Sequence, residues 1–277
     1  MKLLEGRAKV FAGALATLAV ALLLACSGPI VARSPEALYA LAQEQIGNAN
    51  YNPAVDTLAR VARQAPQTEL GRRARLLRIT LLTGMARAFR DIAEAYLKGH
   101  EQAGAAAYAG QMRAVAMDYF GRSRGRSLEM IEALDYLLRE PLPGPVQLEL
   151  ALPSAGAPSQ TLARVRQGNW VDAGELGPVE KEGLANSMTQ AHAALAGAPA
   201  HLQPARIYLG LAREILDLSS IYRPEALGDK RLVRLFHERA ASAAALAAEM
   251  SGRTGNRQLE EESRQLVAHC QDVLKKL

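Results

Sequence analysis

Hydrophobic positions repeat at helical spacing along most of the chain. After Ser34 and Pro35, which are typical of a helix start, apolar residues recur every three or four positions to about residue 139, and again from about residue 179 to the C-terminus. Short segments rich in glycine, asparagine or proline interrupt this pattern, for example at 47–50 and 252–256. Helices joined by short connections pack as antiparallel neighbours, so the pattern predicts a mostly α-helical fold of antiparallel hairpins, arranged as a bundle or as a solenoid.

A segment of different character separates the two helical parts. Three prolines, at 141, 143 and 145, end the helix that precedes it. Apolar and polar residues then alternate at 146–150 and at 162–165, and the loop between these stretches is rich in turn-forming residues. We therefore expect a small β-hairpin or a three-stranded insertion. On this interpretation the chain has a helical region at 34–140, a β-rich insertion at 141–178 and a C-terminal helical region at 179–277.

The N-terminus has the parts of a secretory signal. Basic residues in the first nine positions precede Val10–Ala25, a run of sixteen residues without a charge. This run is shorter than the ~20 residues that cross a bilayer as a helix. It ends in Leu23-Leu24-Ala25-Cys26, which resembles the bacterial lipobox.

The lipobox resemblance implies cleavage before Cys26 and attachment of lipid, palmitate included, to that cysteine. Residues 1–25 are then the signal peptide and 26–33 a lipidated tether, whose seven residues after Cys26 span at most about 25 Å. Ser27 resembles an outer-membrane sorting signal, which implies that the chain faces the periplasm. The alternatives are an ordinary signal peptide with an unrelated cysteine, or a short uncleaved anchor.

Charge and cysteine content narrow the function classes. The whole chain has a formal net charge of +5, and removal of residues 1–25 lowers it to about +3. Since no long run of like charge is present, nucleic acid is not an expected partner. If Cys26 is acylated, Cys270 has no cysteine to pair with, and its helical spacing from Leu266 predicts a small buried side chain.

The stretch from Pro35 to Pro66 resembles one tetratricopeptide repeat, a helical hairpin of 34 residues. The matching positions are Leu38, Leu41, Ala42, Tyr51, Ala54, Leu58, Val61 and Pro66, whereas Gln45 and Pro53 depart from the pattern. A weaker copy spans 69–102, where Arg72 and Arg75 stand in place of apolar residues. The resemblance implies that Tyr39, Gln43 and Arg73 face a partner. The alternative is a helical hairpin that matches the pattern by chance.

The sequence contains no recognisable catalytic or metal-binding motif. The five histidines have no metal-ligand spacing, and neither a G-x-S-x-G motif nor a phosphate-binding glycine loop occurs. We therefore expect no enzyme activity, cofactor or metal. The basic cluster Arg122, Arg124 and Arg126 is a candidate contact for a carboxylate, a phosphate or a lipid headgroup. The alternative is an exposed turn between helices.

These features together predict a noncatalytic adaptor on the periplasmic side of the bacterial envelope that binds another envelope protein. The chain is similar in character to two lipoprotein families. One holds outer-membrane assembly machinery, and the other is associated with tripartite periplasmic (TRAP) transporters. The alternative function is a lipoprotein that binds a small ligand or a lipid in a cavity between the helical halves.

Overall fold

Helices make up almost all of the structure described for this chain. The computed structural model describes residues 34–148, 152, 160–171, 173–196 and 199–277. Cys26 and the predicted signal peptide lie outside the described residues. The part from Pro35 to Leu277 forms one unit with a continuous hydrophobic core.

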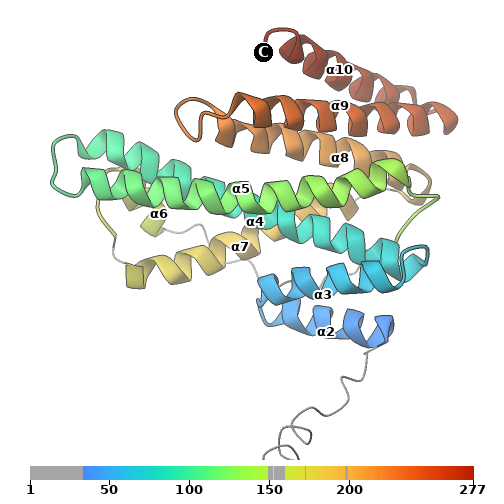
Figure 1. The fold of residues 1–277 in the computed structure, drawn as a ribbon, viewed down its shortest axis with the longest axis horizontal. Coiled ribbons are helices and arrows are strands. Elements are labelled where there is room, and N and C mark those ends of the chain that lie inside the picture. Colours follow the sequence, from blue (N-terminus) through green and yellow to red (C-terminus); the bar gives the residue numbers. More distant parts are fainter. Residues whose placement is uncertain (1–33, 149–151, 153–159, 172, 197–198) are drawn as a thin grey trace, which may run out of the picture. The chain divides into compact units, whose positions relative to one another are not determined.

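Nine α-helices are present in the described residues, which confirms the predicted helical class (Figure 1). They are α2 (Pro35–Gly47), α3 (Tyr51–Gln64), α4 (Glu69–Ala103), α5 (Ala109–Arg139), α6 (Gln160–Arg166), α7 (Ala173–Ala196), α8 (Gln203–Leu218), α9 (Lys230–Arg253) and α10 (Arg257–Leu274). Two short 3-10 helices, η1 (Ala200–Leu202) and η2 (Ser219–Tyr222), flank α8.

Side-chain caps fix where several helices begin. The hydroxyl of Thr68 accepts a hydrogen bond from the backbone N–H of Gly71 at the start of α4, at 3.1 Å. Asp229 accepts hydrogen bonds from the backbone N–H groups of Arg231 and Leu232 at the start of α9. Asn256 caps α10 in the same way. Each cap satisfies N–H groups that a helix cannot satisfy internally.

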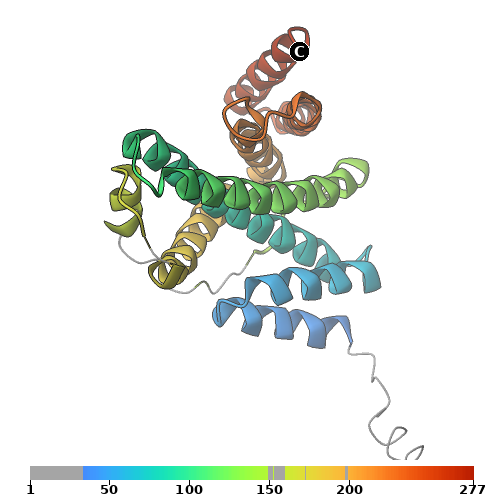
Figure 2. The ribbon, with the colours of Figure 1, turned by 60° about the vertical axis from the view of Figure 1, so that its left-hand side comes forward.

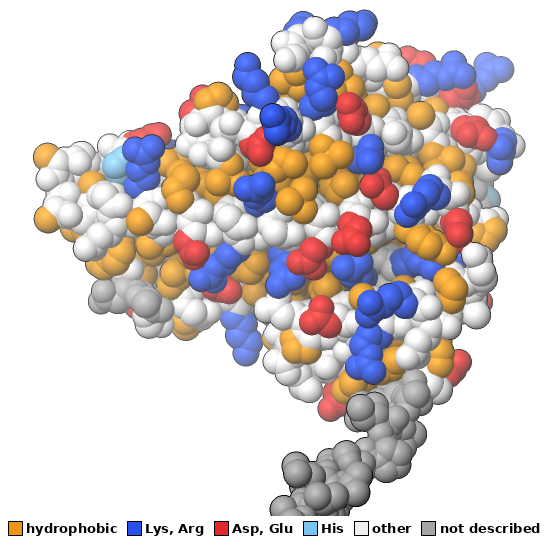
Figure 3. Space-filling model, viewed as in Figure 1, with side chains coloured by type: hydrophobic (Ala, Val, Ile, Leu, Met, Phe, Trp, Pro, Cys, Tyr) orange, Lys and Arg blue, Asp and Glu red, His pale blue; other side chains and the backbone are white. Residues whose placement is uncertain are grey.

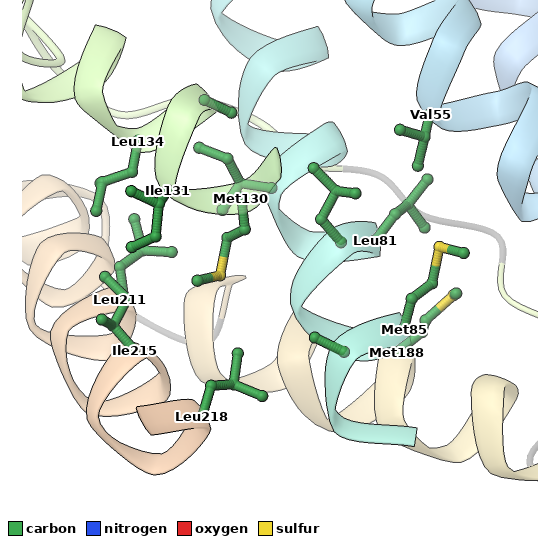
Figure 4. Close-up of a cluster of buried hydrophobic side chains, with 14 of the residues drawn as sticks. Val55, Leu81, Met85, Met130, Ile131, Leu134, Met188, Leu211, Ile215 and Leu218 are labelled. Carbon is green, nitrogen blue, oxygen red and sulfur yellow. The ribbon is translucent and has the colours of Figure 1, made fainter. Parts of the chain in front are cut away.

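Helix α4 is the element around which the others pack. It contacts α2, α3, α5, α6, α7 and α8, and Figure 2 shows these helices on different sides of it. Residues 74–93 of α4 include no exposed residue, as expected for a helix segment enclosed by other helices, whereas Glu94, Lys98 and Glu101 nearer its end are exposed. Figure 4 shows part of the resulting core, in which Leu81 and Met85 of α4 lie among side chains from α3, α5, α7 and α8.

The weaker repeat copy expected at 69–102 is wrong as a helical hairpin. A single helix, α4, spans this stretch without a turn. Its sequence offers no break, because Gly84 and Gly99 are the only glycines between Arg72 and Ala103 and no proline is present. The hairpin expected at 35–66 is present as α2 and α3, which pack together.

The β-hairpin expected within 141–178 is also wrong. The described residues contain no strand, and α6 and the start of α7 occupy 160–166 and 173–178. The alternation at 146–148 does report burial correctly, since Val146 and Leu148 are buried and Gln147 is exposed. A side chain takes the place of a second strand there. Gln203 accepts a hydrogen bond from the Val146 N–H at 2.6 Å and donates one to the Val146 carbonyl at 2.9 Å.

Within the other expected strand, at 162–165, Val165 is buried where α6 crosses α4. A helix of seven residues needs only one buried face, and four alternating residues are too few to distinguish it from a strand. Residues 149–151 and 153–159, which include the rest of the expected hairpin, lie outside the described residues.

Gly84 allows α4 and α7 to approach closely. A Cβ atom at this position would lie 2.6 Å from Cγ and 2.8 Å from Cα of Met188 on α7. These distances are shorter than van der Waals contact, so any side chain at position 84 displaces the backbone of α7. Gly121 on α5, by contrast, is exposed and has no atom within 4 Å of such a Cβ.

The substitution Gly84→Ala should lower the free energy of unfolding by about 1–3 kcal/mol, because overpacking at the α4–α7 crossing outweighs the better helix propensity of alanine. Gly121→Ala is the matched control, and it should stabilise the protein by about 0.5–1 kcal/mol. Thermal unfolding followed by circular dichroism measures both. Equal effects of the two substitutions would contradict the close approach of the two helices.

Tyr208 of α8 connects the end of α5 to the segment that follows it. Its hydroxyl donates to the carbonyl of Leu137 at 3.0 Å and accepts from the backbone N–H of Leu142 at 3.1 Å. The side chain is fully buried, and this burial raises the pKa of Tyr208 from 10.0 to about 12. The neutral hydroxyl therefore satisfies two backbone groups where the chain leaves α5.

We expect Tyr208→Phe to lower the free energy of unfolding by about 1–3 kcal/mol at neutral pH, because two buried backbone groups lose their partner. The difference should then narrow between pH 10 and about 12. In this range the Tyr208 hydroxyl keeps its proton in the folded wild-type protein but has lost it in the unfolded chain. The free energy of unfolding of the wild type therefore falls by about 1.4 kcal/mol per pH unit through this group, whereas the phenylalanine variant has no hydroxyl and no such decrease. Urea denaturation at several pH values measures the difference, and a constant difference would contradict the raised pKa.

Candidate functional site

The end of α3, the first half of α4 and the end of α5 enclose a hollow of about 480 Å³. This volume lies in the range of small-ligand sites. The lining residues are Ala59, Ala62, Arg63, Pro66, Arg75, Arg78, Glu132, Ala133, Tyr136 and Arg139, and we call this hollow the arginine pocket. Figure 3 shows lysine and arginine side chains gathered where these three helices meet, with acidic side chains among them.

Arg75 is the most deeply buried arginine of the pocket, and only 7% of it is exposed. Its guanidinium carbon lies 3.5 Å from the centre of the Tyr136 ring, and its Nη2 donates to the Ala62 carbonyl at 3.3 Å. No carboxylate of the described residues lies within 4.0 Å of its guanidinium nitrogens. Burial lowers the pKa of Arg75, yet arginine stays charged in proteins. The fold therefore holds a buried positive charge that has no ion-pair partner in the part of the chain described.

The other arginines of the pocket are only weakly neutralised. Arg78 is 4.0 Å from Glu129, whose carboxylate lies much closer to Arg126, at 2.7 Å. The buried Nε of Arg78 has no hydrogen-bond partner among the described residues. Arg139 donates from Nε to the carbonyl of Asp135 at 3.2 Å, a neutral acceptor. Donor groups and positive charge are thus left over in this pocket.

The acidic side chains near the pocket are exposed. Glu132 is the acidic residue of its lining. Glu140 accepts hydrogen bonds from the Tyr136 hydroxyl at 2.6 Å and from Nε2 of Gln67 at 3.0 Å. The bond from Tyr136 holds the pKa of Glu140 below its ordinary value. Glu140 therefore orients the ring on which Arg75 stacks.

This arrangement suits the binding of an anion. Guanidinium groups bind carboxylate and phosphate oxygens through paired N–H donors, and burial in a hollow strengthens these contacts. The lining contains neither a serine, threonine or cysteine nucleophile nor a histidine. The pocket thus has the groups needed to hold an anion, and its lining offers no nucleophile of these types.

A second hollow, of about 640 Å³, adjoins the arginine pocket. It lies between α5 and α9, and Arg139 belongs to the lining of both hollows. Its wall combines apolar groups, such as Leu246, with the ion pair between Arg239 and Asp135 at 2.5 Å. Arg239, the arginine that belongs to this hollow alone, is thus better neutralised than the arginines of the arginine pocket.

The structure separates the three residues that the repeat resemblance assigns to a partner surface. Tyr39 and Gln43 lie side by side on α2, where Nε2 of Gln43 donates to the Tyr39 hydroxyl at 3.2 Å. Arg73 lies on α4, where it pairs with Glu69 at 2.5 Å and donates to Gln147 at 3.2 Å. Tyr39 and Gln43 remain a candidate surface pair, and Arg73 has partners within the fold.

The cluster of Arg122, Arg124 and Arg126 lies within α5, which is one continuous helix through residues 121–127. Arg122 pairs with Asp118 at 2.9 Å and with Glu180 at 3.4 Å. Arg126 pairs with Glu129, and its Nη2 donates to Asn52 at 2.8 Å. Arg124 is exposed on another side of the helix. The alternative interpretation of this cluster, an exposed turn between helices, therefore does not hold, and acidic or amide groups already bind two of the three guanidinium groups.

The sequence analysis missed the arginine pocket, although it contained one signal. Arg75 stands out as a charged residue where the repeat pattern expects an apolar one. That departure marks a position directed toward the interior. The second member of the stack, Tyr136, is 61 positions further along the chain, and no short motif connects them.

Other candidate chemistry is absent from the described residues. They contain no group of three or more histidine, cysteine, aspartate or glutamate side chains that could hold a metal ion. No helix among them has the length and apolarity needed to cross a membrane. Cys270 is fully buried as predicted, and burial raises the pKa of its thiol. Cys26 lies outside the described residues.

Comparison with known proteins yields no match, whether to a protein-family model, to a characterised protein or to a solved structure.

A second arginine of α4 has a structural environment that contrasts with that of Arg75. Nη1 of Arg87 donates to both carboxylate oxygens of Glu214 on α8, at 3.1 and 3.2 Å. The Glu214 side chain is only 13% exposed, and burial raises its pKa. Arg87 thus neutralises a buried carboxylate between two helices.

Replacement of each arginine by methionine, which has a similar length, should distinguish the two roles. Arg87→Met should lower the free energy of unfolding by about 3–5 kcal/mol, because it leaves the buried Glu214 carboxylate unpaired. Arg75→Met should lower it by no more than about 1–2 kcal/mol, since only a hydrogen bond and the stacking on Tyr136 are lost. Chemical denaturation measures both. A larger loss for Arg75→Met would mean that Arg75 serves the fold.

Proposed function

We propose that this chain is a lipid-anchored, noncatalytic binding protein of the bacterial envelope, whose arginine pocket receives an anionic group. The observation on which the proposal rests is the buried Arg75 guanidinium, stacked on Tyr136 without a carboxylate of the described residues within 4.0 Å. Exposed acidic groups such as Glu140 offset this charge only in part, and burial of an incompletely compensated charge is unfavourable. A fold that keeps such a charge at the wall of a hollow is well suited to bind an anion there.

The proposed anchor is lipid on Cys26, and the proposed location is the periplasmic face of the outer membrane. The lipobox resemblance and Ser27 support this part of the proposal. A stable lipid anchor requires more than one acyl chain, as in mature bacterial lipoproteins. If the anchor forms there, mass spectrometry should detect a lipid-modified N-terminal peptide that begins at Cys26, and replacement of Cys26 by alanine should abolish it.

The arginine pocket favours the ligand-binding form of this function, since a small anionic molecule or a lipid fits a hollow of this volume. The adaptor form, in which an envelope protein is the partner, has one supporting observation. Tyr39 and Gln43 form a partly exposed, hydrogen-bonded pair on α2, which lies at the edge of the helical unit. Tyrosine is common among the residues that dominate protein–protein binding energies.

Native mass spectrometry of the mature protein, purified from membranes in a non-ionic detergent, tests the proposal. We expect the wild-type protein to retain an anionic molecule that the double variant Arg63→Gln/Arg139→Gln loses. Both residues are exposed at the pocket wall, so the variant should fold. The matched control is Arg124→Gln, which removes an exposed arginine outside the pocket and should leave retention unchanged.

Three outcomes separate the possibilities. Equal retention by all three proteins would place any bound anion elsewhere and would contradict the function of the pocket. A protein that co-purifies with the wild type and is lost with Tyr39→Ala/Gln43→Ala would favour the adaptor form. A wild-type preparation with neither a ligand nor a partner would count against both forms.

A further inference from the structure

The arginine pocket lies at the end of the α2–α3 hairpin where the chain enters the folded unit. Helices α2 and α3 are antiparallel and are joined by a turn at 48–50, so the start of α2 and the end of α3 lie together (Figure 1, Figure 2). Pro35 is the first residue of α2, whereas Arg63 and Pro66 of the pocket belong to the end of α3 and the turn after it. The chain therefore enters the unit beside the pocket.

The length of chain before Pro35 limits how far the pocket can lie from an anchored Cys26. Pro35 is nine positions after Cys26, and a fully extended chain of this length spans about 30 Å. This argument rests on the proposed function, in which Cys26 carries the lipid. In that case the end of the hairpin that holds the pocket stays within reach of the headgroups of the same membrane.

The charge of the pocket favours a phosphate group over a single carboxylate. Its lining contains four arginines and one glutamate. A carboxylate engages one guanidinium in the paired geometry, whereas a phosphate group presents several oxygens to several guanidinium groups at once. The excess of donors at Arg75, Arg78 and Arg139 matches the larger acceptor.

The apolar part of the lining suits the rest of a phospholipid. Ala59, Ala62 and Ala133 lie beside the arginines, and two of these alanines are buried. The face of the Tyr136 ring adds further apolar surface. Such a wall accommodates the glycerol and first methylene groups that adjoin a headgroup phosphate. A free phosphate ion has no apolar groups that could contact it.

We infer that the arginine pocket binds the phosphate group of a membrane phospholipid and thereby gives the folded unit a second point of attachment beside the lipidated cysteine. A single lipid anchor does not by itself fix the orientation of a folded unit over the membrane. A bound headgroup at the end of the hairpin fixes which face of the helices is turned away from the bilayer.

The first arm of the test uses small anions with the mature, lipidated protein in a non-ionic detergent. Inorganic phosphate should raise the melting temperature more than acetate at equal ionic strength, and calorimetry should give its affinity. The double variant Arg63→Gln/Arg139→Gln should bind phosphate about tenfold more weakly or worse, since it loses two charge-assisted contacts. Arg124→Gln, which lowers the net charge outside the pocket, should retain the wild-type affinity within about twofold.

The second arm uses the same protein in lipid nanodiscs, with hydrogen exchange as the readout. Nanodiscs of a neutral glycolipid contain either phosphatidylglycerol or oleate in amounts that give the same negative charge. We expect phosphatidylglycerol, but not oleate, to protect the backbone at 59–66 and 132–139. The double variant should lose this protection, and Arg124→Gln should keep it.

Each other outcome overturns the inference in a different way. Equal effects of phosphate and acetate, or of phosphatidylglycerol and oleate, would show a general anion site and leave the proposed function intact. A response to inorganic phosphate without a response to phosphatidylglycerol would point to free phosphate as the ligand. No response to any anion would overturn the inference and the proposed function together.

Discussion

The burial of α4 between residues 74 and 93, where no residue is exposed, is the constraint on which the rest of this structure depends. In this part, covered by neighbouring helices, polar side chains cannot turn to a solvated face as Glu94, Lys98 and Glu101 do further along α4. Its arginines must therefore find partners inside the fold or reach a hollow. Arg87 and Arg90 meet acidic groups of α8, whereas Arg75 meets the ring of Tyr136 and the arginine pocket.

The arginine pocket forms because the arginines of α4 have different neighbours along the helix. Where α8 covers α4, a carboxylate neutralises each guanidinium. Near its start α4 is covered by α3 and the end of α5, and these supply alanines, a tyrosine and further arginines. Stacking on Tyr136, the Ala62 carbonyl and the nearby charge of Glu140 stabilise Arg75 only in part. The stability of the fold does not require all four arginines that line this hollow.

The sequence predicted the helices well because each has several apolar residues at regular spacing, and caps such as Asp229 mark where helices begin. It failed where the pattern was short. The four residues at 162–165 fit a strand as well as a helix, and the alternation at 146–148 arises because the amide of Gln203 occupies the place of a neighbouring strand. The prediction of a second repeat copy was wrong because the residues that match the repeat pattern are buried positions of the single helix α4, and none of them indicates a turn.

The site was less predictable than the fold for a related reason. The arginines of the pocket come from three helices, and their positions run from 63 to 139. Only the packing around α4 brings them together, so no local motif identifies them. The three closely spaced arginines on α5 formed a more conspicuous cluster, but Arg122 and Arg126 are held in ion pairs and Arg124 lies on another side of the helix.

The proposed binding of an anion at the arginine pocket would also make the stability of the folded protein depend on its location in the cell. A ligand that binds only the folded state stabilises it in proportion to the logarithm of ligand concentration. If the arginine pocket binds an anion of the envelope as proposed, copies that have reached this ligand are harder to unfold than copies in transit or in the wrong compartment. Proteases that degrade transiently unfolded chains would then remove the misplaced copies first, and Arg75 would make correct delivery a condition of a long lifetime.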